Sequence, residues 1–375
     1  MRVNLLARPR VPALAFAAAV VPLLLFSLPV AADAQSSGVY AQRNLVSDLP
    51  NVARFQDPNL VNAWGLSHSP TGPWEVSDNG TGLATRYKSN GMGVPPVVTI
   101  PLPGGVPGGA PTGNIFNSTS DFVVSEGSAS GPSQFVFATE DGTISGWNPD
   151  VDLTHAIIGV DRSGVREGKF LGAVYKGLAL GHNSSGNFLF ATDFRFGTVE
   201  MFDAKFTLVK SFTDPALASD CPIRGQCFAP FGIQNIGGNL YVSFALQNAA
   251  HHDDVSGAGN GFVDVFDTNG NMVQRFASHG TLNSPWGLAL APADFGAFSN
   301  DVLVGNFGDG RINAFAPSGT LLGQLQNQDG HPITINGLWG LAFGNGALAG
   351  DTNTLFFASG LNDEADGLFG SIAPA

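Results

Sequence analysis

The stretch Pro285-Trp286-Gly287-Leu288 decides the fold, because variants of it recur along the chain. Five copies share the order of a leading residue, a glycine and an aliphatic residue: Trp64-Gly65-Leu66, Lys176-Gly177-Leu178, Phe231-Gly232-Ile233, Trp286-Gly287-Leu288 and Trp339-Gly340-Leu341. A weaker sixth copy, Pro111-Thr112-Gly113-Asn114-Ile115, shares the leading proline. The glycines are 48, 64, 55, 55 and 53 residues apart, so the sequence contains six units of about 55 residues.

Each unit repeats the same order of strands and turns. After Gly232, for example, an apolar strand spans residues 240–244, an alternating strand 261–266 and a closing strand 272–276. The turn Asp267-Thr268-Asn269-Gly270 contains the Asn-Gly pair that suits a hairpin. Four short antiparallel strands repeated six times predict an all-β fold, a six-bladed β-propeller. Glycine fits the innermost strands because backbones converge near the axis.

The last unit predicts how the ring closes. It has three strands, within residues 338–343, 355–358 and 367–372, and then the chain ends. The segment 39–46 precedes the first glycine strand and supplies the missing fourth strand. We therefore predict that the N-terminal strand completes the last blade and removes an open edge.

The first 34 residues have the pattern of a signal peptide. Three arginines precede an apolar stretch from Val11 to Val30, and Ala32-Asp33-Ala34 fits the small-x-small rule of signal peptidase. A retained membrane anchor is the alternative, because about 20 apolar residues can span a bilayer. Prolines within the stretch and the cleavage site favour removal. We expect residues 1–34 to be cleaved and residues 35–375 to form one propeller domain, exported to the periplasm or the medium.

Composition and charge limit the partners. Only 13% of residues are charged while 49 are Gly and 29 are Phe, which is typical of short buried strands and tight turns. Losing three arginines and one aspartate with the signal peptide would change the formal charge from −13 to −15. Nucleic acid and anionic membranes need a basic surface, so both are disfavoured as partners. We expect a soluble monomer with no membrane span after the signal peptide is removed.

The two cysteines, Cys221 and Cys227, predict a disulfide, since exported proteins usually oxidise such pairs. A metal site there would need further ligands nearby, and the neighbouring sequence offers none.

Several motifs resemble those of a family of exported bacterial propellers without an assigned activity. The longest is the run from His252 to Asp267, and the others are Asn62-Ala63-Trp64-Gly65-Leu66, the run from Asn336 to Leu341 and the run from Glu364 to Gly370. The resemblance covers essentially the whole mature chain. Many members end in a Pro-Glu-Pro sorting tail, which is absent here, so surface sorting of that kind is not expected. More distantly, the layout is similar to NHL-repeat and gluconolactonase-like propellers, which implies a fold and not a function.

In such propellers, the turns after the second strands share a face with the starts of the inner strands, and polar residues there converge on the channel. The candidate ligand-binding residues are Asn62, Trp64, Asp78, Glu140, Asp193, Arg195, Asn283, Trp286, Asn306, Asn336, Trp339 and Glu364. The candidate metal ligands are His251, His252, Asp253 and Asp254. An oxygen-rich ring suits Ca²⁺ or another divalent cation. The alternative is that Asp and Asn simply make good turns, and that the repeated tryptophans are packing residues.

Two functions remain open. The first is a binding or scaffold propeller that recognises a carbohydrate, peptide or protein at the channel face. The second is a divalent-metal hydrolase or lactonase; by resemblance, gluconolactonase-like enzymes hold one ion in the channel and use metal-activated water. No nucleophile elbow, His-Glu-x-x-His pair or P-loop is present in the sequence, which disfavours a nucleophilic enzyme, although a catalytic triad needs no adjacency in sequence.

Overall fold

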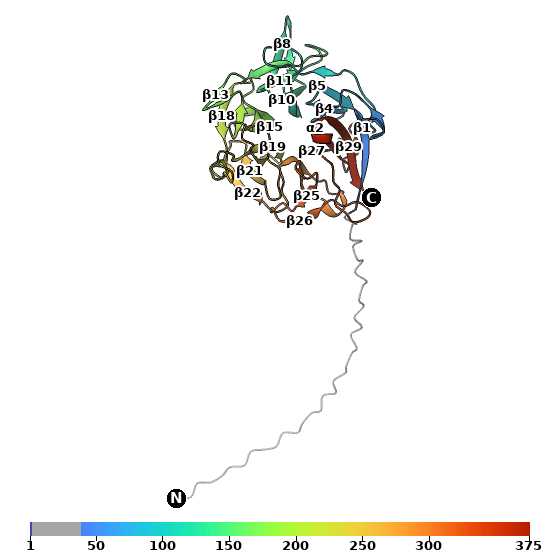
Figure 1. The fold of residues 1–375 in the computed structure, drawn as a ribbon, viewed down its shortest axis with the longest axis vertical. Coiled ribbons are helices and arrows are strands. Elements are labelled where there is room, and N and C mark those ends of the chain that lie inside the picture. Colours follow the sequence, from blue (N-terminus) through green and yellow to red (C-terminus); the bar gives the residue numbers. More distant parts are fainter. Residues whose placement is uncertain (2–38) are drawn as a thin grey trace. The chain divides into compact units, whose positions relative to one another are not determined.

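Six antiparallel sheets follow one another around a ring in the computed structural model (Figure 1). The structure describes Met1 and residues 39–375; the apolar stretch and cleavage site of the predicted signal peptide lie outside them. From the axis outward, blade 1 consists of β3 (Ala63–His68), β4 (Trp74–Asp78), β5 (Leu83–Tyr87) and β6 (Val98–Thr99). Blade 2 consists of β7 (Pro111–Phe116), β10 (Phe135–Thr139), β11 (Thr143–Trp147) and β12 (Ile157–Asp161). Blade 3 consists of β15 (Tyr175–Asn183), β16 (Gly186–Asp193), β17 (Thr198–Phe202) and β18 (Leu208–Phe212).

Blades 4 to 6 have the same order. Blade 4 consists of β19 (Phe228–Ile236), β20 (Asn239–Leu246), β21 (Phe262–Asp267) and β22 (Met272–Ser278). Blade 5 consists of β23 (Pro285–Leu290), β24 (Val302–Asn306), β25 (Ile312–Phe315) and β26 (Leu321–Gln324). Blade 6 consists of β27 (Leu338–Phe343), β28 (Leu355–Gly360), β29 (Asp366–Pro374) and β1 (Tyr40–Ser47). The prediction of a six-bladed propeller with four-stranded blades is confirmed.

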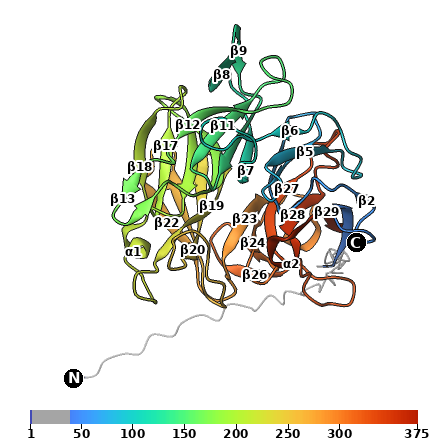
Figure 2. The ribbon, with the colours of Figure 1, turned by 45° about the horizontal axis from the view of Figure 1, so that its top comes forward.

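Several short elements lie in the connections between the strands of the blades. They are β2 (Phe55–Gln56), which runs parallel to β1, the hairpins β8 (Val123–Glu126) with β9 (Ala129–Pro132) and β13 (Arg166–Glu167) with β14 (Phe170–Leu171), and the single turns α1 (Pro215–Ala218), η1 (Gly296–Phe298) and α2 (Leu361–Glu364). Both hairpins lie between Gly113 and Gly177, which accounts for the 64-residue spacing there. The β8–β9 hairpin projects from the ring (Figure 2). No helix among the described residues is long and apolar enough to cross a membrane.

The inner-strand glycines allow neighbouring blades to approach closely. A Cβ atom placed on Gly65 would lie 2.4 Å from the carbonyl oxygen of Thr112, and one on Gly340 would lie 2.5 Å from that of Trp64. Such separations leave no room for a side chain, so the predicted reason for these glycines is confirmed. The second contact joins blade 6 to blade 1, and it shows that the close packing continues around the whole ring.

The N-terminal strand closes the last blade. β1 pairs with β29 in antiparallel register, from Tyr40 opposite Pro374 to Ser47 opposite Leu368. In Figure 1 the blue β1 lies beside the red β29. The Tyr40 hydroxyl donates to the carbonyl oxygen of Phe295 at 2.9 Å, which ties the strand to blade 5. The predicted closure is therefore confirmed.

The predicted disulfide between Cys221 and Cys227 is also confirmed. It lies in the loop that connects blade 3 to blade 4, just after α1, and Cys227 directly precedes β19.

Candidate functional site

One face of the ring gathers most of the predicted polar residues. Because Ala63 pairs with Asp78 and Leu338 with Ser359, the inner strand of a blade begins where its second strand ends. We call this side of the molecule the channel face.

Aromatic side chains fill the axis below the channel face. Trp64 and Trp339 have ring centroids 3.8 Å apart, and Trp286 packs edge-on against both. Phe307 stacks on Trp339 with a centroid distance of 4.0 Å and remains partly exposed. Phe231, which precedes the inner glycine of blade 4, contacts Trp339 as well. The aromatic residues before four of the inner glycines thus converge on the axis. Together with Phe307 we call them the aromatic plate, which consists of Trp64, Phe231, Trp286, Phe307 and Trp339.

Lys176 occupies the same position in blade 3 and is the one cation in this ring of leading residues. Its side chain is only 2% exposed, and its Nζ lies 4.9 Å from the Trp64 ring centroid. The ammonium donates to Oε1 of Glu140 and lies 3.6 Å from Oδ1 of Asp253. A cation over the face of a tryptophan and between two carboxylates is strongly stabilised.

A chain of hydrogen bonds runs from the Lys176–Glu140 ion pair around the mouth of the channel. Asn79 Nδ2 donates to Glu140 at 3.0 Å, and Asn62 Nδ2 donates to Asn79 at 3.2 Å and to Glu364 at 2.7 Å. The Oδ1 atom of Asn62 accepts from Trp64 Nε1 at 2.8 Å, which fixes the orientation of the amide. Asn62 therefore links the aromatic plate to the carboxylates above it.

The long loop after β20 supplies the other side of the mouth. His252 Nδ1 lies 2.7 Å from Oδ1 of Asp253, and Asp253 is 61% exposed. Together with the chain described above, these residues form the channel-face network, which consists of Asn62, Asn79, Glu140, Lys176, His252, Asp253 and Glu364.

The carboxylates of the network keep the Lys176 ammonium charged. Burial acts to lower the pKa of Lys176, but the carboxylates of Glu140 and Asp253 outweigh it, and the pKa is raised. The hydrogen bond from His252, aided by Lys176, lowers the pKa of Asp253 to about 2. Burial raises the pKa of Glu364 despite the hydrogen bond from Asn62. One ammonium therefore acts with three carboxyl groups: it donates to Glu140, lies 3.6 Å from Asp253 and interacts at longer range with Glu364.

Unusual backbone geometry accompanies the network. Asn62 has a φ of 49°, and Asn362, Asp363 and Glu364 in α2 have φ values of 53°, 54° and 68°. Left-handed conformations at consecutive residues other than glycine are costly and persist where the surroundings enforce them. Two residues of the network are thus held in place by strained backbone.

Other predicted residues lie elsewhere on this face. Three asparagines bind the backbone of loops: Asn283 accepts from the N–H of Gly257, Asn306 donates to the carbonyl of Thr281, and Asn336 accepts from the N–H of Asn362. Asp254 is half-buried and accepts a hydrogen bond from the Ser256 hydroxyl. Arg195 and His251 line a separate cavity beside the network.

Asp78 and Asp193 are fully buried within their blades. Asp193 Oδ1 accepts from the backbone N–H groups of Val174 and Phe196, both at 3.2 Å. Burial, with the nearby Glu200, raises the pKa of Asp193 to about 7. Neither aspartate is among the residues of the channel-face network.

This raised pKa predicts a pH dependence of stability. An unfolded aspartate titrates near pH 3.9, so between about pH 4 and 7 the folded state binds more protons, and stability falls as the pH rises through this window. We expect the melting temperature to be higher at pH 5 than at pH 8, and Asp193→Asn to reduce the difference by roughly 4 °C, measured by circular dichroism.

Asp150→Asn, at an exposed position, serves as the control and should leave the pH profile unchanged. If Asp193→Asn gave the same dependence of melting temperature on pH as the wild type, Asp193 would be ionised in the folded protein, and the inference of a raised pKa would be wrong.

The candidate residues predicted from the sequence did not include Lys176 or Asn79, although Asn79 lies in one of the polar turns expected on this face. Lys176 could have been found, because it is a lysine at a position that is aromatic in four of the other units. Asn79 carried no comparable signal, since Asn is common in turns.

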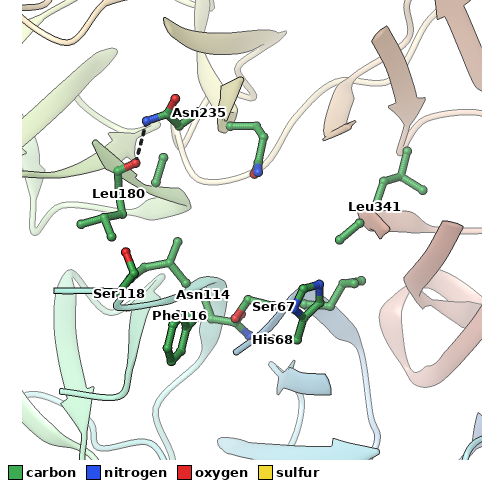
Figure 3. A pocket seen from close by; sticks show the side chains of 13 residues that line it. Ser67, His68, Asn114, Phe116, Ser118, Leu180, Asn235 and Leu341 are labelled. Atoms are coloured by element: carbon green, nitrogen blue, oxygen red, sulfur yellow. Dashed lines mark hydrogen bonds between the residues drawn. The ribbon is translucent and has the colours of Figure 1, made fainter. Parts of the chain in front are cut away.

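A second cavity, of about 410 Å³, opens on the opposite face (Figure 3). No Asp, Glu, Lys or Arg lies among its lining residues. Asn235 Nδ2 donates to the carbonyl of Leu180 at 2.9 Å, and the ring nitrogens of His68 lie within hydrogen-bonding distance of backbone carbonyls. These polar groups mainly hold strands together, so the channel face is the better candidate site.

The fold and the site together define a class: a six-bladed β-propeller with a charged, amide-rich network at one mouth of its channel. The chain is 32% identical over 331 residues to uncharacterized protein R648 of Acanthamoeba polyphaga mimivirus, a match that covers 88% of this chain and 78% of the relative. The protein belongs to the same family as this viral protein. No family model matches the chain.

Solved structures show the same fold at low identity. A streptogramin B lyase has a TM-score of 0.52 at 13% identity, covering 90% of this chain and 97% of the lyase. A gluconolactonase from Xanthomonas campestris has a TM-score of 0.52 at 13% identity, covering 84% of this chain and 87% of the enzyme. The distant similarity to gluconolactonase-like propellers is confirmed at the level of fold, and the resemblance to an exported bacterial family stays a prediction.

Proposed function

We propose that this protein is a binding propeller whose channel-face network recognises a hydroxyl-rich ligand such as a carbohydrate. The observation that carries the proposal is the position of Lys176, whose ammonium donates to Glu140 and lies 3.6 Å from Asp253. A binding site built this way presents partly exposed carboxylates, an amide and an imidazole, which the buried ammonium holds in place. Hydroxyl groups both donate and accept hydrogen bonds, so they match such an alternating set.

The aromatic plate supports the same class of ligand. Phe307 is partly exposed at the mouth and is supported from below by Trp339. The apolar faces of sugar rings pack against aromatic rings of this kind. Asp253 and His252 are accessible, whereas Lys176 and Asn62 are buried and would act mainly by holding the carboxylates in place.

A glycan array tests this proposal. We expect the wild-type protein to bind at least one glycan saturably, and Glu140→Gln to weaken binding about tenfold, because it removes a charge-assisted acceptor. Glu126→Gln, at the tip of the exposed β8–β9 hairpin, is the matched control and should bind as wild type. Absence of glycan binding, or equal binding by both variants, would contradict the proposal.

A divalent-metal hydrolase or lactonase is the second candidate function. Ligand atoms of Glu140, His252 and Asp253 lie within 4.8 Å of one another, a spacing that suits one metal ion. The ammonium of Lys176 contacts the same two carboxylates and would repel a bound cation, so the geometry favours the binding propeller. Calorimetric titration with Zn²⁺ and Ca²⁺ separates the two: stoichiometric binding by wild type, together with turnover of a lactone, would favour the hydrolase.

The N-terminal pattern supports a further part of this proposal. We infer that residues 1–34 are removed as a signal peptide and that the propeller of residues 35–375 acts as a monomer in the periplasm or the medium. The disulfide supports this location, because disulfides persist in oxidising compartments.

A further inference from the structure

A cavity of about 480 Å³ lies on the channel face beside the network, where loops of blades 3 and 4 meet. The β13–β14 hairpin, the turn after β16, α1 and the loop after β20 form its walls. The disulfide closes the loop that carries Cys227, so this wall is covalently constrained. The cavity is therefore present without any rearrangement of the blades.

The walls are largely apolar. Phe170, Phe196 and Phe228 line the cavity, and Phe170 stacks on His251 with a centroid distance of 4.3 Å. Lys169 covers the outer side of Phe170, with Nζ 4.9 Å from the ring centroid. An apolar molecule of drug-like size fits a cavity of this volume and lining.

Two polar atoms of the lining have no hydrogen-bond partner within residues 39–375. They are Nε of Arg195 and Oγ1 of Thr213, and both are buried. Nη1 of Arg195 is used, since it donates to the carbonyl oxygens of Leu171 at 2.6 Å and Gly172 at 3.0 Å. Buried polar atoms usually have partners, and within residues 39–375 only Nη1 of the Arg195 guanidinium has one, so this group keeps donors for an acceptor in the cavity.

The charge of the lining points to an anionic acceptor. Lys169 and Arg195 outnumber Glu167, the one acid of the lining, and the carboxyl groups of Glu140, Asp193 and Asp253 that act on Arg195 lie outside the lining. The planar fork of a guanidinium recognises carboxylate and sulfonate groups through paired hydrogen bonds.

We propose that this cavity is a second binding site, separate from the channel-face network, for a small apolar molecule that carries one anionic group. The apolar body lies against Phe170, Phe196 and Phe228, and the anionic group lies at Arg195.

Two fluorescent probes of matched shape test the site. 8-Anilinonaphthalene-1-sulfonate carries a sulfonate, and N-phenyl-1-naphthylamine is its neutral counterpart. We expect the wild-type protein to bind the sulfonate at one molecule per chain. Ala218→Phe, which fills the cavity from the exposed side of α1, should weaken the binding of both probes at least about tenfold.

Variants of Arg195 separate charge recognition from shape. Arg195→Gln should weaken the sulfonate about tenfold and the neutral probe less than about twofold, and Arg195→Lys should restore part of the difference. Lys205→Gln removes an exposed cation from the turn between β17 and β18 at the opposite end of the blade, and it should change neither affinity. Lys176→Met should leave sulfonate binding intact, which distinguishes this site from the network.

Three results would overturn the proposal. They are unsaturable binding of the sulfonate by wild type, an Ala218→Phe variant that binds it unchanged, and an Arg195→Gln variant that weakens both probes equally.

Discussion

Replacing Gly232 with alanine is expected to destabilise the propeller by about 3 kcal/mol. The added Cβ would lie 2.0 Å from the carbonyl oxygen of Trp286, which belongs to the inner strand of the next blade. Both groups are backbone or directly attached to it, so no side chain can move aside and the two blades must separate. Denaturation in urea, followed by tryptophan fluorescence, measures the loss.

Other glycines provide an internal scale for this prediction. A Cβ on Gly177 would meet its nearest atoms at 3.0 Å, so Gly177→Ala should cost clearly less, about 1 kcal/mol. Gly164 has open space around it and should tolerate alanine within about 0.5 kcal/mol. A Gly232→Ala variant as stable as Gly164→Ala would show that the inner strands are not packed as described.

These same contacts explain why the fold could be predicted from the sequence. A glycine required at every inner strand recurs in each unit, and its spacing reveals the number of blades. The closing strand was predictable too, because the last unit lacks a strand that the N-terminal segment can supply. The β13–β14 hairpin and α1 were not predicted, since both are short elements within connecting loops and have little periodicity of their own.

The candidate site was predictable only in part, and a shift of one residue accounts for much of the difference. Asp78, Asp193 and Asn306 are the last residues of their second strands, and all three are fully buried. The next residue along the chain is Asn79, Phe194 or Phe307. Asn79 belongs to the channel-face network, Phe307 belongs to the aromatic plate, and Phe194 packs on Phe231 of that plate.

Successive side chains of a strand point in opposite directions, so the exact end of each strand decides which residue reaches the axis. Sequence patterns locate strand ends to within a few residues, which is too coarse for this choice.

The contacts between blades could not be predicted from the sequence, for a different reason. Lys176 meets Glu140 from blade 2 and Asp253 from the loop of blade 4, and these residues are far apart along the chain. Their meeting depends on the loop after β20 folding back toward the axis, which neither its composition nor its length specifies. Asn62, Glu140 and Glu364 were identified as candidates, but their connection through Asn79 required the structure.

Deleting residues 39–47 is expected to abolish the stable folded state. The deletion removes the buried side chains of Tyr40, Leu45 and Val46, each worth roughly 1.5 to 3 kcal/mol of burial, and leaves β29 without its outer partner. It also removes the hydrogen bond from Ser47 Oγ to the carbonyl of Gly367, at 2.7 Å. The combined loss is comparable with the roughly 5 to 15 kcal/mol that stabilises a typical domain.

Complementation distinguishes ring closure from a general sensitivity to truncation. A synthetic peptide of residues 39–49, added to the truncated chain, should restore a cooperative melting transition, because β1 pairs with β29 through its own backbone along its length. A variant with Gln42 and Arg43 replaced by alanine keeps the strand and changes only exposed side chains, so it should melt as wild type. If the truncated chain melted at the wild-type temperature without the peptide, β1 would be an accessory strand, and five complete blades with a three-stranded sixth would suffice to hold the ring.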